Sequence, residues 1–249
     1  MKSYNEQLTA LRASGNLRHL PEVEHQGIWI LKEGKRMLNL SSNDYLGLAS
    51  RQDLQEEFQA STQDRFYPYS SSSSRLLTGN FSVYTKLEKQ IARSFDREAA
   101  LIFNSGYHAN TGILPALTDK QTLLLADKLV HASIIDGILL SGSPFLRYRH
   151  NDYDQLERLV QKNACQYETI IILTESIFSM DGDVADLNRL IAIKRQYPNI
   201  LLYVDEAHAI GARGKTGLGI AEEQSCIQEI DLLVGTFGKA LALSLIHIS

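Results

Sequence analysis

The chain contains little cysteine. Its two cysteines, Cys165 and Cys226, stand far apart among 249 residues and lack C-x-x-C spacing. A disulfide framework needs paired cysteines in an oxidising compartment, and a cysteine metal site needs closely spaced ones. The scarcity argues against both, so we expect no metal, and a reducing cytoplasm fits the composition.

Charge of one sign is not concentrated anywhere in the sequence. The net charge is −4, and the 25 Lys and Arg residues are scattered along the chain, which leaves no basic patch for nucleic acid or anionic lipid. No apolar run approaches the roughly 18 residues of a membrane span, and residues 1–11 lack a signal-peptide layout. We therefore expect a cytoplasmic protein with small-molecule partners, no nucleic acid and no membrane.

Proline is also scarce, with five residues, while 44% of the chain is hydrophobic. This profile predicts a compact protein of one large domain or two small ones. Residues 1–40 form a separate N-terminal segment in this prediction. Tyr4–Ser14 predicts a short helix that Gly15 ends, and Ile28–Leu40 predicts a hairpin that turns at residues 33–35.

Short apolar runs alternate with amphipathic stretches along the rest of the chain. The runs are typical of buried parallel strands; they are Ala99–Phe103, Thr122–Ala126, Phe145–Tyr148, Thr169–Thr174, Ile200–Val204 and Leu232–Thr236. The stretches with helical periodicity are Asn110–Leu117, Ser133–Leu140, Tyr153–Asn163 and Leu187–Tyr197. The β-α alternation predicts an α/β fold, a mostly parallel sheet flanked by helices on both faces, with functional residues at the carboxyl ends of the strands. The serine run Ser70–Ser74 reads as a surface loop.

The segment from Phe103 to Asn110 leaves a predicted strand, turns at Ser105-Gly106 and enters a predicted helix. Such a turn aims free backbone N–H groups and the positive end of a helix at the space above the sheet, where a phosphate is stabilised. A simple helix cap explains the same pattern, and more often.

An acidic residue and a lysine follow two of the predicted strands. Asp205 directly follows the run Ile200–Val204, and Lys239 comes shortly after Leu232–Thr236. Pyridoxal phosphate requires a lysine that bonds to its aldehyde, a carboxylate that keeps its pyridine nitrogen protonated, and a phosphate cradle. Asp205 alone suits a loop salt bridge and Lys239 alone a solvated surface. Together with Gly106 they predict a pyridoxal phosphate site.

Two further candidates follow strands in the same way. His131 follows the run Thr122–Ala126, where an imidazole could stack on a flat ring and move protons, although such a histidine is more often a cap or a core residue. Ser179 lies in a polar loop after Thr169–Thr174 and could donate to a cofactor oxygen, although most such serines only form turns.

Seven blocks in this order resemble the α-oxoamine synthases, a family of fold-type-I pyridoxal-phosphate enzymes. They are Ser41-Ser42-Asn43-Asp44-Tyr45-Leu46-Gly47, Ser74-Arg75-Leu76-Leu77-Thr78-Gly79-Asn80, Ser105-Gly106-Tyr107, His131-Ala132-Ser133, Ser179-Met180-Asp181-Gly182-Asp183, Asp205-Glu206-Ala207-His208 and Thr236-Phe237-Gly238-Lys239. The resemblance runs from about Arg18 to about Ala242, nearly the whole chain.

The resemblance implies condensation of an amino acid with an acyl-CoA, with release of CoA and carbon dioxide, at a site built between the subunits of a homodimer. It implies that Lys239 bonds to the cofactor and takes the proton from the amino acid, and that His131 stacks on the ring and helps to hold the substrate. The other implied cofactor contacts come from Gly106, Tyr107, Ser179, Asp205, His208 and Thr236, and the substrate contacts from Arg18 and Asn43.

The blocks are shared across the family, so they distinguish poorly between the individual enzymes of the family. The block Ser74–Asn80 favours the branch that acts in biotin biosynthesis over glycine C-acetyltransferase, whereas the run His131–Gly137 also occurs in acetyltransferases. The Ser70–Ser74 run replaces a stretch that is richer in glycine in the family, which bears on acyl-chain preference.

The chain departs from the family after Lys239. We expect residues 41–242 to form an incomplete cofactor-binding domain, residues 243–249 to be a foreign tail, and the family's C-terminal small domain to be absent. A fragment that binds pyridoxal phosphate without catalysis, or that fails to fold alone, is the competing hypothesis. A dinucleotide-binding enzyme has no support, because no G-x-G-x-x-G follows a predicted strand.

Overall fold

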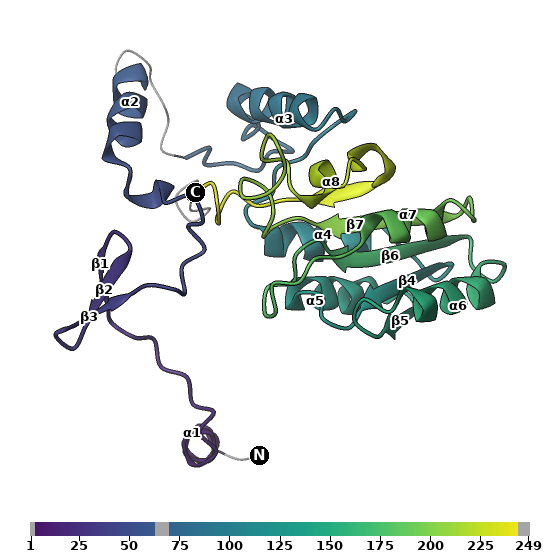
Figure 1. Cartoon of the computed structure of the whole chain (residues 1–249), viewed down its shortest axis with the longest axis horizontal. Helices are drawn as coiled ribbons and strands as arrows, with labels where there is room; N and C mark the ends of the chain where they lie inside the picture. Colours follow the sequence, from purple (N-terminus) through teal and green to yellow (C-terminus); the bar gives the residue numbers. More distant parts are fainter. Residues whose placement is uncertain (1–2, 63–69, 244–249) are drawn as a thin grey trace. The chain divides into compact units, whose positions relative to one another are not determined.

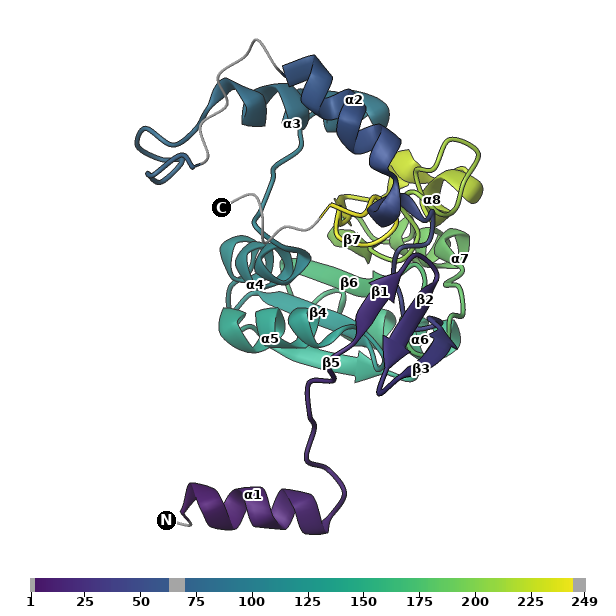
Figure 2. The ribbon, with the colours of Figure 1, turned by 90° about the vertical axis from the view of Figure 1, so that its left-hand side faces the viewer.

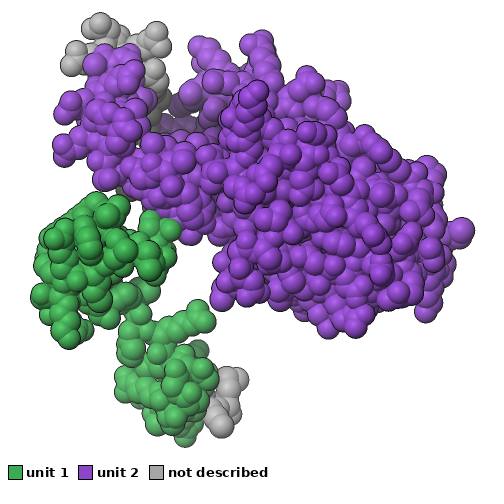
Figure 3. Space-filling model, viewed as in Figure 1, with its two compact units in different colours: residues 1–42 green, residues 43–249 purple. Residues whose placement is uncertain are grey.

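The computed structural model describes residues 3–62 and 70–243. The predicted foreign tail thus lies outside the described residues, apart from Leu243. The chain divides into two units, residues 1–42 and residues 43–249 (Figure 3).

The first unit contains a helix and a small antiparallel sheet. Helix α1, Tyr4–Ala13, begins with a capping box in which Ser3 and Glu6 bind each other's backbone N–H groups. The sheet has the order β1-β2-β3 and consists of β1 (Glu24–Gln26), β2 (Trp29–Lys32) and β3 (Lys35–Leu38). The turn between β2 and β3 has positive φ at Glu33 and Gly34, 50° and 73°, as a two-residue hairpin requires. The predicted helix and hairpin are confirmed, and β1 adds a strand that was not predicted.

The second unit is built on a parallel five-stranded sheet with the order β5-β4-β6-β7-β8 (Figure 1). The strands are β4 (Thr122–Asp127), β5 (Phe145–Tyr148), β6 (Thr169–Glu175), β7 (Ile200–Asp205) and β8 (Leu232–Val234). Every side chain of β4 is buried, and β6 and β7 are nearly as buried, because helices cover both faces of the sheet. The runs predicted at these positions are confirmed as strands.

Helices lie on both faces of the sheet. They are α4 (Gly106–Leu117), α5 (Ala132–Ser141), α6 (Tyr153–Asn163), α7 (Leu187–Lys194) and α8 (Ile220–Glu223), with the 3₁₀ turn η2 (Ile227–Glu229) before β8. The connection from β4 to β5 runs one way along the sheet and the later connections run the other way, so right-handed crossovers put α5 on one face and α6, α7 and α8 on the opposite face. Helix α4 packs beside α5 (Figure 2). The predicted α/β class with helices on both faces is correct.

One predicted strand, Ala99–Phe103, is wrong. This segment has no regular structure and no strand partner within the described part of the chain. The Ile102 N–H donates to Glu88 Oε1 at 2.9 Å, and the Ile102 carbonyl accepts from Arg75 Nη1 at 3.1 Å. Side chains thus satisfy the backbone groups that a neighbouring strand would otherwise satisfy, and an apolar pattern does not reveal whether such a neighbour exists.

The remaining elements precede the sheet in the chain. They are the 3₁₀ turn η1 (Leu48–Ser50), helix α2 (Gln52–Thr62) and helix α3 (Ser82–Ser94). Ser70–Ser74 has no helix or strand, in agreement with the predicted loop. Arg75 anchors the end of this loop to α3 through Glu88 at 2.8 Å and also donates to Asn80.

Candidate active site

Charged side chains gather where the three strands β6, β7 and β8 end. Glu175 ends β6 and Asp205 ends β7, and the two residues are paired in register. Neighbouring parallel strands point paired side chains to the same face, so these two carboxyl groups lie side by side. Lys239 follows β8, the next strand in the sheet. The sheet order therefore brings together residues that are far apart in sequence.

A chain of hydrogen bonds starts at Lys239. Its Nζ lies 2.7 Å from His208 Nε2, and His208 Nδ1 lies 2.7 Å from the Tyr45 hydroxyl. Tyr45 Oη in turn lies 3.2 Å from Asn43 Oδ1. The lysine amine donates to Nε2, Nδ1–H donates to Tyr45 and the tyrosine donates to Asn43, so one proton arrangement satisfies all four groups.

The two basic groups in this chain of hydrogen bonds, Lys239 and His208, both have a lowered pKa, which favours their neutral forms. Burial, and then the charge of Lys239, lower the pKa of His208 to about 4. Burial lowers the pKa of Lys239 as well, against the attraction of Asp205 and Glu175. A lysine that forms a bond to an aldehyde must present an unprotonated amine, and this environment favours that form.

Asp205 is held by two donors. Its Oδ2 accepts from Asn110 Nδ2 at 2.9 Å, and its Oδ1 accepts from the Ala207 backbone N–H at 2.9 Å. Each oxygen keeps a lone pair for a further donor. Glu206, the next residue, is buried and accepts from Ser176 Oγ at 2.5 Å and from the N–H groups of Ile220 and Ala221, which fixes the backbone beyond β7.

His131 is the N-cap of α5. Its Nδ1 accepts from the Ser133 backbone N–H at 3.2 Å and lies 2.7 Å from Ser133 Oγ. The capping interpretation of this histidine is therefore correct. The ring remains exposed, so the cap leaves it accessible for a second role.

The start of α4 forms a cradle. Ser105 is the N-cap and accepts from the His108 N–H at 3.0 Å, which leaves the N–H groups of Gly106 and Tyr107 at positions where a helix supplies no acceptor. A Cβ at Gly106 would meet no atom of the chain within 4 Å, so the backbone is open there. The Tyr107 hydroxyl donates to Asp136 at 2.8 Å, which fixes the side chain on α5.

Ser179 lies in the wall of a pocket beside His208. The volume is about 380 Å³, and the lining residues are Tyr45, Ile177, Phe178, Ser179, Gly182, His208, Ala212 and Arg213. The loop that carries Ser179 is closed by backbone bonds between Phe178 and Asp183 and between Gly182 and Phe178. Thr236 accepts from the Gly238 N–H at 3.2 Å, and its hydroxyl proton remains available to a ligand.

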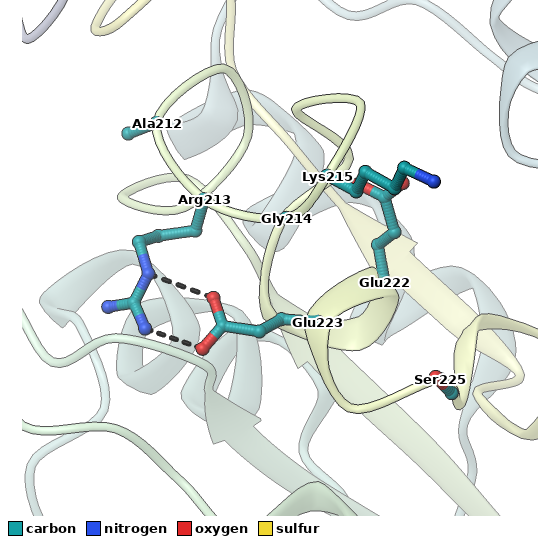
Figure 4. A pocket seen from close by; sticks show the side chains of 7 residues that line it. All are labelled: Ala212, Arg213, Gly214, Lys215, Glu222, Glu223 and Ser225. Atoms are coloured by element: carbon teal, nitrogen blue, oxygen red, sulfur yellow. Dashed lines mark hydrogen bonds and ion pairs between the residues drawn. The ribbon is translucent and has the colours of Figure 1, made fainter.

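A larger pocket of about 630 Å³ contains none of the predicted site residues (Figure 4). An ion pair between Arg213 and Glu223 spans one side of it, with Nη2 and Oε1 2.6 Å apart. Lys215 and Glu222 also line it. We place the chemistry at the smaller pocket, because predicted site residues, His208 and Ser179, line it.

The predicted site residues fall into two groups. In the second unit, the hydrogen bonds join Lys239, His208 and Asn43 in one chain, and Asp205 to His131 through intervening side chains. Arg18 belongs to the first unit.

Sequence reasoning did not select four residues of the site, although motifs or strand ends contained them. Tyr45 and Ser133 stand inside quoted blocks, Asn110 stands one turn after Gly106, and Glu175 directly follows the predicted strand Thr169–Thr174. Burial raises the pKa of Glu175 to about 7, with a further contribution from Asp205, and its Oε1 has no hydrogen-bond partner. An alternation of strands and helices cannot indicate which buried polar groups meet.

The residues present fit pyridoxal phosphate. The open backbone at Gly106 suits a phosphate, Asp205 retains lone pairs for a pyridinium N–H, and the Lys239 amine is shifted toward its neutral form. The unpartnered, buried Glu175 Oε1 is an acceptor without a donor at the same strand ends. No helix among the described residues is long and apolar enough to span a bilayer.

Sequence relatives carry one name. A protein of Haemophilus influenzae (strain 86-028NP), provisionally named 8-amino-7-oxononanoate synthase, is 60% identical over 242 residues, which cover 97% of this chain and 64% of the relative. A protein of Neisseria gonorrhoeae (strain NCCP11945) with the same provisional name is 59% identical with the same coverage. The chain thus spans somewhat less than two thirds of the length of these relatives.

Solved structures share the fold. A variant of serine palmitoyltransferase from S. paucimobilis, with a bound pyridoxal phosphate–myriocin adduct, matches with a TM-score of 0.83 at 26% identity over 95% of this chain and 59% of that one. The 8-amino-7-oxononanoate synthase of Francisella tularensis matches with a TM-score of 0.66 at 30% identity over 82% of this chain and 55% of that one. The sequence model of class I and II aminotransferases matches residues 35–245. The chain therefore belongs to the aminotransferase class I and II family, with a fold-type-I architecture.

Proposed function

We propose that the protein is a pyridoxal-phosphate-dependent acyltransferase that acts as an 8-amino-7-oxononanoate synthase in biotin biosynthesis. It condenses L-alanine with pimeloyl-CoA or a pimeloyl carrier protein and releases carbon dioxide together with the free thiol of CoA or of the carrier protein. The observation that carries the proposal is the Lys239 amine, 2.7 Å from His208, beside the strand end where Asp205 is held by two donors. The names of the 60% and 59% identical relatives support the choice of reaction.

When bound, pyridoxal phosphate supplies an electron-withdrawing ring that stabilises negative charge at the Cα of an amino acid. Asp205 would hold the ring nitrogen in its protonated form. His131 would lie against the ring, and His208 would contact its hydroxyl oxygen. The backbone of Gly106 and Tyr107 and the hydroxyls of Ser179 and Thr236 would hold the remaining polar atoms.

Lys239 accepts the Cα proton in this proposal. Burial lowers the pKa of Lys239 and so increases the share of the neutral amine, which is the form that takes a proton. His208, with a pKa of about 4, stays neutral beside it and offers Nε2 as an acceptor rather than a repelling charge. Asn43 and Arg18 bind the substrates, and the protein works as a cytoplasmic homodimer.

Two alternatives remain as outcomes of the test. One is glycine C-acetyltransferase or another α-oxoamine synthase, since the run His131–Gly137 does not separate these reactions. The other is a fragment that binds the cofactor without turnover, because the chain covers 64% of its relatives. Both alternatives retain the cofactor. The first gives different products, and the second gives none.

The experiment is an absorbance titration of the purified chain with pyridoxal phosphate, followed by borohydride reduction and peptide mass analysis. We expect a visible band and a reduced adduct at Lys239, both lost in Lys239→Ala and retained in Lys215→Ala, a matched control in the larger pocket. CoA release is then measured as free thiol with alanine and pimeloyl-CoA and with glycine and acetyl-CoA. An adduct at another lysine, or none, would refute the cofactor site, and release only with glycine and acetyl-CoA would favour the acetyltransferase.

A further inference from the structure

Asn110 occupies the centre of a buried polar network beneath the site. It lies on α4 with 1% of its surface exposed. Its Nδ2 donates to Asp205 Oδ2 and to Ser133 Oγ, each at 2.9 Å, and its Oδ1 accepts from the Tyr203 hydroxyl. Both amide protons and the carbonyl oxygen are therefore in use, and they reach two separate elements, β7 through Tyr203 and Asp205 and α5 through Ser133.

The donor and the acceptor of each hydrogen bond in this network are fixed. Burial, and then the charge of Asp205, raise the pKa of Tyr203 well above its ordinary value, so its hydroxyl keeps its proton and donates to Asn110 Oδ1. That bond fixes which end of the amide faces Asp205. A reversed amide would bring Oδ1 against the carboxylate and leave the Tyr203 hydroxyl facing N–H groups.

The same assignment of donors and acceptors extends through Ser133 to His131. Asn110 donates to Ser133 Oγ, so the Ser133 hydroxyl proton is free to point to His131 Nδ1, 2.7 Å away. The Ser133 backbone N–H also donates to Nδ1, at 3.2 Å. A nitrogen that accepts two bonds carries a lone pair, which places the ring proton on Nε2.

The backbone also holds Asn110 in place. A Cβ on Gly137 of α5 would lie 2.4 Å from the Asn110 carbonyl oxygen, so only glycine permits this approach of the two helices. The close packing of the two helices therefore fixes the backbone of α4 at Asn110 against α5.

We propose that Asn110 is a positioning residue that orients the Asp205 carboxylate and, through Ser133, holds His131 as its Nε2–H tautomer. The proposal rests on the proposed function for the ligand that Asp205 and His131 meet. Without the Asn110 amide, Asp205 loses one of its two donors, and Ser133 loses the donor that directs its hydroxyl to His131. A single side chain thus sets the geometry of the carboxylate and the proton position on the imidazole.

The first readout is the tautomer, which needs no cofactor. We would label the histidines with ¹⁵N, assign the His131 ring signals by their loss in His131→Gln, and read the nitrogen shifts in the chain without ligand. Wild type should show the Nε2–H form. Ser133→Ala and Asn110→Leu should both shift His131 toward a mixture of tautomers, and an unchanged Nε2–H form in Asn110→Leu would overturn the proposal.

The second readout is the dissociation constant for pyridoxal phosphate. Asn110→Leu should weaken binding by at least about tenfold, as expected for loss of a hydrogen bond to a charged group. Ser133→Ala, which leaves the bond to Asp205 intact, should change it by less than about threefold. Equal effects of the two variants, or no effect of Asn110→Leu, would contradict the role.

Asn163→Leu is the matched control. Asn163 is a buried asparagine on α6 that donates to the Leu159 carbonyl at 2.7 Å, so its loss should lower stability without moving either readout. Should Asn110→Leu fail to fold, Tyr203→Phe removes only the hydroxyl that orients the amide and should shift both readouts in the same direction by a smaller amount; wild-type values in that variant would count against the proposal. A wild-type chain that shows the Nε2–H form but does not bind pyridoxal phosphate would refute the proposed function alone.

Discussion

At the scale of single residues, the environment of Lys239 decides its reactivity. The amine is partly buried, contacts a neutral histidine and is attracted by Asp205 and Glu175. Burial lowers the pKa of Lys239 more than these carboxyl groups raise it. The sequence contains 25 Lys and Arg residues, and nothing in the spacing alone distinguishes this lysine's ionisation from that of the others.

This environment predicts a pH profile. In competitive acetylation of the ligand-free chain, followed by peptide mass analysis, the reactivity of Lys239 should rise with a midpoint below the ordinary value of 10.5. Asp205→Asn removes an attraction that raises the pKa, so the midpoint should fall further. A midpoint at or above 10.5 would show that burial does not dominate. An upward shift in Asp205→Asn would show that Asp205 does not raise the pKa of Lys239.

At the scale of elements, His150 joins the end of β4 to the loop that carries Ser179. Its Nδ1 lies 2.9 Å from Asp127 Oδ1 and its Nε2 lies 2.6 Å from Asp183 Oδ2. Burial opposes the charge on the ring, but the hydrogen bonds to these two carboxylates outweigh it and raise the pKa of His150. The ring also packs edge-on against Phe178, 4.4 Å between centroids.

The raised pKa of His150 predicts how stability depends on pH. The charged form contributes stability that is fully present below the ordinary pKa of 6.5 and is lost as pH rises through the higher pKa of the folded state. In urea unfolding, His150→Gln should cost about 2 kcal/mol at pH 6 and less at alkaline pH. His25→Gln, at an exposed position in the first unit, should leave the difference between the two pH values unchanged. A loss that grows with pH would contradict the sign.

The close approach of α4 and α5 gives a second prediction for elements. A Cβ on Gly137 would meet Asn110 O at 2.4 Å and Leu114 Cδ1 at 3.0 Å, so Gly137→Ala should cost about 1–3 kcal/mol of unfolding free energy by overpacking. Gly112, in the interior of α4, has its nearest neighbour at 3.4 Å, so Gly112→Ala should be neutral or stabilise by about 0.5–1 kcal/mol. Similar losses in both variants, measured by urea unfolding, would argue against the clash.

At the scale of the whole molecule, Arg97 connects the segment after α3 to the entry of β8. Its guanidinium donates to the carbonyls of Ile227, Ile230 and Asp231, more than 125 residues later in the chain. These bonds hold the strand that leads to Lys239. A lysine at the same position has no planar fork and cannot reach three carbonyls in this geometry.

Arg97→Ala should therefore lower the unfolding free energy by about 2–3 kcal/mol, because the buried carbonyls lose charged donors. Arg97→Lys should recover only part of that loss. Arg93→Ala, in the last turn of α3 on an exposed side chain, is the control and should change stability by less than about 0.5 kcal/mol. Urea titration of the three variants checks the order, and an Arg97→Ala chain as stable as the control would refute it.

Much of the architecture followed from local sequence. The strands from β4 to β8 were predictable because consecutive apolar residues must be buried on both faces of a sheet. The prediction of a strand at Ala99–Phe103 was wrong because side chains, not a neighbouring strand, bind its backbone: Glu88 accepts from the Ile102 N–H and Arg75 donates to the Ile102 carbonyl. The pattern of apolar residues indicates which residues are buried, but it does not indicate which segment pairs with them.

The sequence by itself determined the fold class, the order of the elements, and the Asp205 and Lys239 positions that point to pyridoxal phosphate, because residue type and spacing constrain these directly. Only the tertiary structure decided that His208 lies between Lys239 and Tyr45, and that Asn110 joins Asp205 to Ser133. Contacts of this kind span up to 163 residues of sequence. They arise from the order of the strands and the packing of α4 on α5, and no local pattern encodes either.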